Sequence, residues 1–213
     1  MARKKLFRIQ EATILPNIVQ HDNPDAKILV QEFLKKQKKA FLELGCGRGE
    51  YTIGLATLYP KVQCIGVDVQ GERMWHGAKE GLMKKMENVL FIRTQIGKLL
   101  EFMPEHSIDE IWLPFSDPFP RKKKAKKRLT SPTFLKMYKK ILKPGGIIHL
   151  KTDNENLFLY TKEIIEMTGA KIMQEDTDVQ VTEDEKNPLN IQTQYEKRFR
   201  AQGKKIFHVS FTL

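Results

Sequence analysis

The chain has 213 residues and a mass of 24.8 kDa, and its 37 Lys and Arg residues against 26 Asp and Glu residues give a formal net charge of +11. For this mass, surface scaling predicts that roughly 70% of the surface of the unfolded chain is buried on folding, which is enough for a single core. The sequence is 40% hydrophobic and contains 13 Gly and 10 Pro, a composition that excludes a collagen-like chain and argues against wholesale disorder.

Several other classes of protein are disfavoured because their signals are missing. No apolar run approaches the roughly 20 residues of a membrane span, so we expect no membrane partner. The first residues, MARKKLFRIQEA, are charged and lack the apolar core of a secretory signal, so we expect a cytoplasmic protein. Cys46 and Cys64 form no disulfide framework, and the five His residues lack metal-ligand spacing, so we expect no metal.

Strand and helix signals alternate along most of the chain. In chain order we expect a strand at 39–44, a helix at 51–59, a strand at 62–68, a helix at 70–86, strands at 89–94 and 107–115, a helix from Ser131 to KPGG, a strand at 145–153, a helix at 154–168 and weaker strands at 170–175 and 205–213. This alternation predicts an α/β fold in which helices cover both faces of a mostly parallel sheet. Ligands of such sheets bind at the carboxyl ends of the strands.

A glycine turn, ELGCGRG at 43–49, follows the first of these strands and precedes a helix. Glycines at such a turn let the backbone approach a ligand closely. A dinucleotide fingerprint requires a glycine three residues after Gly47, where this chain has Glu50, and Glu43 would repel a pyrophosphate but attract a cationic ligand such as S-adenosylmethionine. Asp68 ends the next strand, where a carboxylate accepts hydrogen bonds from ribose hydroxyls. The alternative is that Glu43 and Asp68 only cap neighbouring helices.

A second unusual segment closes the strand at 107–115. The residues FSDPFP at 115–120 are followed by RKKKAKKR at 121–128, which carries seven positive charges in eight residues. Such a tract suits a polyphosphate backbone, because each Lys or Arg near a phosphate releases counterions on binding. A solvated charge run or a localisation tag is the alternative, but the position of the tract at the end of a central strand favours nucleic acid delivered to a bound cofactor.

Taken together, the sequence resembles the bacterial tRNA (guanine-N7)-methyltransferases over roughly residues 40–212. The resemblance rests on ELGCGRG, IGVD, FSDPFPRKKKAKKRLT, HLKTDN and TQYEKRF, in family order and with similar spacing. It implies the Rossmann-like seven-stranded fold of S-adenosylmethionine-dependent methyltransferases. It also implies transfer of a methyl group to N7 of a guanosine in tRNA, at position 46 of the variable loop, with S-adenosylhomocysteine as the second product.

The resemblance also assigns roles to individual residues. Asp117 is implied to be the catalytic residue. The residues implied to bind the cofactor are Glu43, Gly45, Gly47, Gly49, Asp68, Gln95 and Asp117. The residues implied to bind the substrate or its RNA backbone are Arg121, Lys122, Lys123, Lys124, Lys126, Lys127, Arg128, Asp153, Thr193, Gln194, Tyr195 and Glu196.

At four positions the chain departs from the usual family residue. Gln95 stands in place of Asp on the adenine side of the cofactor, Phe119 in place of Trp, and Lys124 in place of a common His. Arg121 replaces a Lys, which keeps the charge but exchanges a point charge for a planar fork. Phe119 and Tyr195 are candidates for stacking on the target base.

The expected chemistry makes small demands on the protein. Guanine N7 has an exposed lone pair and carries no proton at neutral pH, so no strong base is needed, and Asp117 is interpreted as an acceptor that orients the donor edge of the guanine. We expect a basic arm that can be partly ordered at 1–38 and a single methyltransferase domain at 39–213, in a monomer or a homodimer. A non-catalytic RNA-binding protein, and a methyltransferase for another RNA or a small molecule, remain alternatives.

Overall fold

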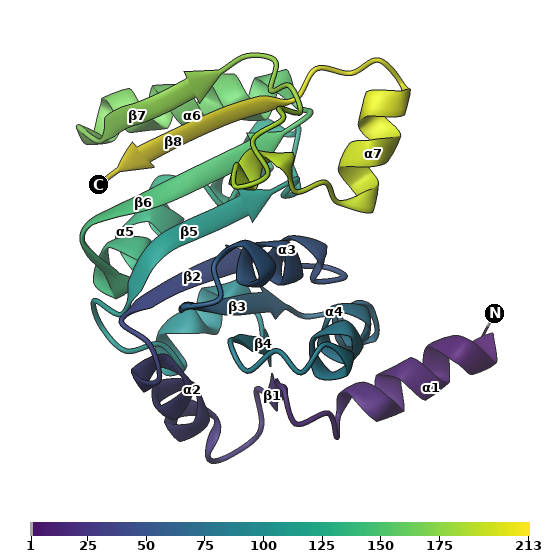
Figure 1. Ribbon diagram of the computed structural model, residues 1–213. Helices are drawn as coiled ribbons and strands as arrows, with labels where there is room; N and C mark the ends of the chain where they lie inside the picture. Colours follow the sequence, from purple (N-terminus) through teal and green to yellow (C-terminus); the bar gives the residue numbers. More distant parts are fainter. Residues whose placement is uncertain (1) are drawn as a thin grey trace. The chain divides into compact units, whose positions relative to one another are not determined.

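A computed structural model (Figure 1) describes residues 2–213. The chain divides after residue 104 into two units. Within the described residues, each unit is built on four strands. The elements of the first unit are α1 (Ala2–Ala12), β1 (Ile18–Gln20), α2 (Ala26–Lys35), β2 (Lys39–Leu44), α3 (Glu50–Leu58), β3 (Val62–Asp68), α4 (Gly71–Met83), β4 (Val89–Arg93) and the 3₁₀ helix η1 (Ile96–Glu101).

The four strands of the first unit are parallel and lie in the order β1-β4-β3-β2. Residues 62–67 of β3 and residues 40–44 of β2 are buried without alternation, as expected for strands covered on both faces. Both strands lie within the ranges that the apolar runs predict, and α3 and α4 follow at the predicted places. The parallel arrangement brings the carboxyl ends of β2, β3 and β4 to one edge of this sheet.

Residues 2–38 belong to the first unit, in which they form α1, β1 and α2. The carboxylate of Glu11 on α1 accepts a hydrogen bond from Trp75 Nε1 at 2.7 Å and pairs with Lys79, both on α4. The three residues of β1 pair with β4 from Ile18 to Gln20. Met1 of the expected arm lies outside the described residues, and the boundary at residue 38 remains a prediction.

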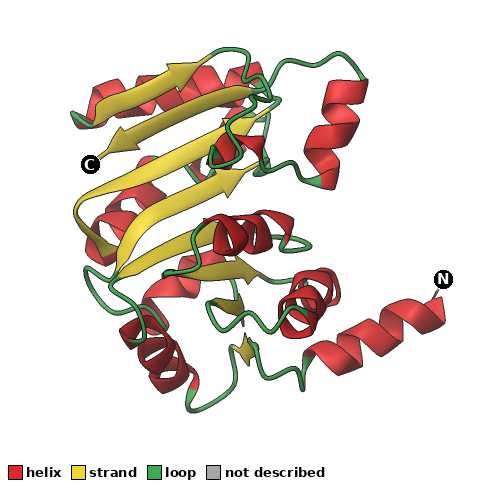
Figure 2. Cartoon of the chain, in the orientation of Figure 1, coloured by secondary structure: helices red, strands yellow, loops and turns green. Residues whose placement is uncertain are grey.

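The second unit comprises β5 (Ile108–Pro114), the 3₁₀ helix η2 (Lys122–Lys127), α5 (Pro132–Ile141), β6 (Leu142–Thr152), α6 (Glu155–Thr168), β7 (Lys171–Asp176), the 3₁₀ helix η3 (Pro188–Asn190), α7 (Gln194–Ala201) and β8 (Phe207–Thr212). Its strands lie in the order β5-β6-β8-β7, in which only the β5–β6 pair is parallel among the described residues. Figure 2 shows α6 running alongside these strands, and Figure 1 shows α7 beyond the carboxyl ends of β5 and β6.

Local sequence signals explain the helix ends in this unit. Pro132 occupies the first turn of α5 after Ser131, as predicted. Asn154 caps α6 by accepting a hydrogen bond from Leu157 N at 2.9 Å, and the helix ends at Gly169, whose φ is +71°. Helix α7 was not predicted, although Thr193 and Glu196 have the spacing of a capping box, and Thr193 Oγ1 accepts from Glu196 N at 3.2 Å.

No helix within residues 2–213 is long and apolar enough to cross a membrane. Among the side chains that the structure describes, no three His, Cys, Asp or Glu residues gather as a metal site would require.

Candidate functional site

The glycine turn of the first unit leaves open space beside its backbone. Gly45, Gly47 and Gly49 have φ values of +76°, +52° and +76°, in the left-handed region that favours glycine. Within the part of the chain that the structure describes, a Cβ added at Gly45 or Gly47 would meet no atom within 4 Å. A Cβ at Gly49 would lie 2.7 Å from the ring of Phe91. The first two glycines therefore border a space that a ligand can fill, whereas the third is required for packing.

Glu43 lies at the end of β2 with only 3% of its surface exposed. Its Oε2 accepts hydrogen bonds from Thr52 N at 2.7 Å and from Thr52 Oγ1. Burial is the main cause that raises the pKa of Glu43 to about 8; the hydrogen bonds from Thr52 oppose this rise, and the nearby carboxylates of Asp68 and Glu50 add to it. A cation bound beside these carboxylates would favour the ionised form of Glu43.

Asp68 connects the end of β3 to the glycine turn. Its Oδ2 accepts a hydrogen bond from Gly47 N at 2.9 Å, and its Oδ1 accepts one from Gln70 N at 2.9 Å. Gln95 follows β4, where it is exposed and precedes η1. The structure therefore brings Glu43, Asp68 and the turn together, and it places Gln95 after a neighbouring strand of the same sheet.

In the second unit, the loop FSDPFP (115–120) has an unusual backbone. Phe115 and Phe119 have φ values of +51° and +40°, which are rare for residues with a side chain. Asp117 lies between them, exposed, and its Oδ1 accepts a hydrogen bond from Phe119 N at 2.9 Å. Backbone strain of this kind clusters at functional sites, where the surrounding structure must maintain it.

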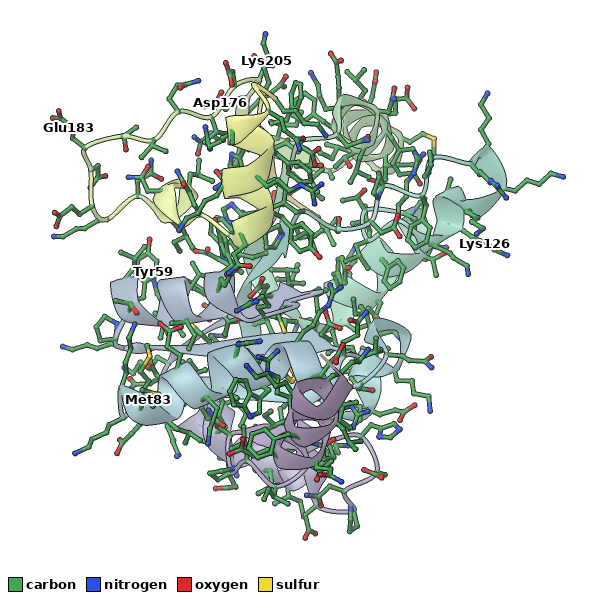
Figure 3. The ribbon with its side chains drawn as sticks, turned by 90° about the vertical axis from the view of Figure 1, so that its right-hand side faces the viewer. Tyr59, Met83, Lys126, Asp176, Glu183 and Lys205 are labelled. Atoms are coloured by element: carbon green, nitrogen blue, oxygen red, sulfur yellow. The ribbon has the colours of Figure 1, made fainter. Side chains whose placement is uncertain are left out.

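The basic tract folds into η2 and presents six of its seven cations to solvent. Arg121, Lys122, Lys123, Lys124, Lys126 and Lys127 are exposed, and Figure 3 labels Lys126 on this turn. Arg128 differs, because it is buried and donates to Pro118 O at 2.9 Å and Phe119 O at 3.2 Å. Its guanidinium also lies 4.2 Å from the ring centroid of Tyr160. Arg128 thus braces the loop of Asp117 from within the protein.

The remaining expected substrate residues range from exposed, through the half-buried Asp153, to buried. Gln194 and Tyr195 are exposed on the first turn of α7, Tyr195 by 47%. Asp153 Oδ2 accepts from Lys204 Nζ at 2.7 Å. Glu196 has no exposed surface and pairs with Lys151 Nζ at 2.7 Å and with Arg200 at 2.8 Å. Sequence reasoning missed Lys151, although a Lys inside an otherwise apolar strand is the signal that could have found it.

Comparison with known proteins identifies the family. A family model described as "Putative methyltransferase" matches residues 37–209. The tRNA (guanine-N(7)-)-methyltransferase of Bacteroides fragilis is 45% identical over 183 residues, which cover 86% of this chain and 72% of that protein. The protein of the same name from Christiangramia forsetii is 38% identical and covers 100% of this chain and 99% of its own length. The chain belongs to the tRNA (guanine-N(7)-)-methyltransferase family.

Family membership confirms the resemblance to the tRNA (guanine-N7)-methyltransferases that the sequence motifs indicated, and the chain is therefore a methyltransferase. A solved SAM-dependent methyltransferase from Aquifex aeolicus superposes with a TM-score of 0.57, at 18% identity, over 89% of this chain and 93% of that chain. At this identity the likeness shows the fold alone, and it confirms the predicted Rossmann-like α/β class. Among the described residues there are eight strands in place of the seven expected, because the short β1 adds one.

The residues of the first unit fit the cofactor expected of this family. S-adenosylmethionine carries a sulfonium and an ammonium, and the carboxyl groups of Glu43, Asp68 and Glu50 gather at the glycine turn, where a bound cation would favour the ionised form of Glu43. Among the described residues, no atom lies within 4 Å of where a Cβ would stand at Gly45 or Gly47, so such a molecule has room to lie against the backbone there.

Proposed function

We propose that this chain transfers the methyl group of S-adenosylmethionine to N7 of a guanosine in tRNA, at position 46 of the variable loop. The observation that carries the proposal is the identity to relatives named for this activity, 38% over the whole chain in one case. The exposed basic turn beside Asp117 supports an RNA substrate independently of those names. The products are 7-methylguanosine in the tRNA and S-adenosylhomocysteine.

We assign the cofactor to the glycine turn and its neighbours. When bound, the cofactor supplies an electrophilic methyl group on a sulfonium, so the C–S bond breaks as the C–N bond forms. Gly45 and Gly47 provide backbone against which the methionine part lies, while ionised Glu43 offsets its positive charge. Asp68 retains acceptor capacity for ribose hydroxyls beyond its bonds to Gly47 N and Gln70 N.

Two further residues, Gln95 and Gly49, belong to the cofactor assignment. The side-chain amide oxygen of Gln95 can accept a hydrogen bond from the adenine amino group, as the usual Asp would. Gly49 contributes through packing against Phe91, and its substitution would displace the turn. The family pattern alone links Asp117 to the cofactor, and we assign Asp117 to the guanosine.

We assign the phosphate backbone of the tRNA to the exposed cations of the tract, Arg121, Lys122, Lys123, Lys124, Lys126 and Lys127. Each phosphate contact releases counterions, which contributes affinity without sequence preference and makes binding strongly dependent on salt. Arg128 contributes by holding Pro118 and Phe119 in place. Sequence-independent affinity alone does not select one guanosine, so selection falls to other residues of the unit.

We assign recognition of the guanosine to Asp117, Asp153 and the first turn of α7. Asp117 is exposed and uses only Oδ1 for Phe119 N among the hydrogen bonds of the described residues, so its Oδ2 can accept from the donor edge of guanine. Phe119 and the exposed ring of Tyr195 are suited to stacking on the base. Because N7 carries no proton, alignment of the nucleophile supplies the catalysis and no general base acts.

The reaction takes place where tRNA is found, and we therefore propose a cytoplasmic enzyme, as a monomer or a homodimer. The test is to incubate the protein with methyl-labelled S-adenosylmethionine and unmodified tRNA, digest the RNA and identify the labelled nucleoside. Labelled 7-methylguanosine supports the proposal. A different labelled nucleoside would overturn the target, and tRNA binding without labelling would favour the non-catalytic alternative.

A further inference from the structure

Lys151, on β6, places an ammonium group inside the second unit. Only 1% of the residue is exposed. Its Nζ donates to Leu189 O at 2.7 Å and to Ile191 O at 3.0 Å, and it pairs with Glu196 Oε2 at 2.7 Å. These partners come from η3, from the segment after it and from the first turn of α7. Burial of a charge is unfavourable unless it is paired and hydrogen-bonded, and Lys151 meets both conditions.

The contacts continue from Glu196 into a neighbouring segment. Glu196 Oε1 accepts from Arg200 Nε at 2.9 Å, and Arg200 Nη2 donates to Val179 O at 2.9 Å. The ammonium of Lys151 and the guanidinium of Arg200 therefore flank one carboxylate, and together they fasten both turns of α7 to the unit. Replacement of the ammonium would leave Glu196 buried with a single cation.

The backbone of Lys151 supports the loop that carries Asp117. Its carbonyl oxygen accepts a hydrogen bond from Phe115 N at 2.7 Å, at the residue where the backbone enters the left-handed region. The ring of Phe115 lies 5.9 Å from that of Phe199 on α7, and Phe199 lies 6.4 Å from Tyr195, measured between centroids. Lys151 thus contacts both the loop that carries Asp117, through its backbone, and the helix that presents Tyr195, through its side chain.

We propose that Lys151 is a positioning residue, which fixes α7 relative to the FSDPFP loop so that Asp117 and Tyr195 address the same guanosine. The inference rests on the proposed function. It assigns Glu196 to the same device, as the buried partner of Lys151 and not as a group that touches RNA. A buried ion pair often contributes little net stability compared with apolar side chains of similar size, so stability alone does not account for it.

The first experiment compares Lys151→Met with a matched control, Lys143→Met. Lys143 lies on the same strand and pairs with Asp109 at the same 2.7 Å, but near the other end of β6 and partly exposed. For Lys151→Met we expect kcat for tRNA methylation to fall at least about ten-fold, with KM for tRNA changed less than about three-fold, because the exposed cations still bind the backbone. The control should keep kcat within about two-fold, as expected for a partly exposed ion pair.

Affinity for S-adenosylmethionine, measured by calorimetry without RNA, distinguishes a positioning role of Lys151 from a general disruption of the folded protein. It should stay within about two-fold of the wild type in Lys151→Met, because the glycine turn, Glu43 and Asp68, to which the cofactor is assigned, lie in the other unit. A fall in kcat of less than about ten-fold, or a parallel loss of cofactor affinity, would overturn the inference. If the wild type makes no 7-methylguanosine, the proposed function fails before any variant is compared, and this inference fails with it.

The double variant Lys151→Met, Glu196→Leu distinguishes a positioning role of Lys151 from a contribution to stability alone. Exchange of the buried pair for apolar side chains is expected to restore the Tm toward that of the wild type. The contacts to Leu189 O and Ile191 O are still missing, so we expect kcat to remain at least about ten-fold low. Recovery of kcat together with Tm would show that Lys151 acts only through stability. If neither variant folds, Glu196→Gln provides the same test, since it keeps the shape of the side chain and should lower kcat at least about ten-fold.

Discussion

Substitution by Ala at Gly47 and at Gly49 should lower both stability and cofactor affinity, but the larger loss of stability is expected at Gly49 and the larger loss of affinity at Gly47. Both have left-handed backbones, so Ala costs about 1–2 kcal/mol at either position. At Gly49 the new Cβ would also lie 2.7 Å from Phe91 and 3.2 Å from Gly77 Cα, and such overpacking adds about 1–3 kcal/mol. At about 2–4 °C per kcal/mol, we expect Tm to fall by roughly 4 °C for Gly47→Ala and roughly 10 °C for Gly49→Ala.

Cofactor affinity should rank the other way. The methyl group of Gly47→Ala projects into space that is empty among the described residues and that we assign to S-adenosylmethionine. We expect at least about a ten-fold rise in Kd for this variant, and a smaller rise for Gly49→Ala at a temperature where it is folded. Thermal unfolding and calorimetric titration of the two variants measure both quantities. Wild-type affinity in Gly47→Ala, with a Tm lower than that of Gly49→Ala, would refute the placement of the cofactor.

Four further predictions follow from individual residues. Because burial raises the pKa of Glu43 to about 8, affinity for the cationic cofactor should rise with pH by up to about ten-fold per pH unit and level off near pH 8. Calorimetry should show that Glu43→Gln flattens this pH profile. An unchanged profile in the variant would count against the role of Glu43. Asp117→Ala should lower kcat about 100-fold while cofactor Kd is retained, and an equal loss of both would make Asp117 a cofactor ligand. Replacement of Lys122, Lys123 and Lys126 by Ala should reduce the slope of log Kd for tRNA against log salt by about 2–3, whereas an unchanged slope would exclude the tract from the interface. Burial lowers the pKa of His208 to about 3 in the folded protein, so only the unfolded chain binds a proton at this histidine as the pH drops below its ordinary pKa of about 6.5, and the folded state loses stability. Urea unfolding should show that the free energy of unfolding falls by about 1.4 kcal/mol between pH 7.5 and 5.5, and that His208→Gln removes this loss. An equal loss in the variant would show that other groups cause it.

Local patterns predicted the strands and turns that hold the candidate cofactor site. The apolar runs of β2 and β3 end at the polar residues Glu43 and Asp68, and parallel strands bring such ends together. The Ser131–Pro132 signal likewise placed the start of α5. These features were predictable because each depends on residues that are adjacent in the sequence.

Features that depend on distant contacts were not predictable in the same way. The strand β1 has three residues and is ordered by pairing with β4, so it leaves no periodic signal of its own. The tract at 121–128 gave no indication that Arg128 is buried against Pro118, Phe119 and Tyr160 while its neighbours are exposed. Similarly, TQYE appears as a polar run, and only the tertiary structure shows that Glu196 is buried against Lys151.

The central claim is that guanine N7 in tRNA is the methyl acceptor. The most direct measurement uses two synthetic tRNAs that differ only at position 46, one with guanosine and one with 7-deazaguanosine, in which carbon replaces the nucleophilic nitrogen. We expect both tRNAs to bind with the same affinity, and only the guanosine form to accept label from methyl-labelled S-adenosylmethionine. Equal labelling of the two tRNAs would contradict the claim and direct attention to another acceptor atom.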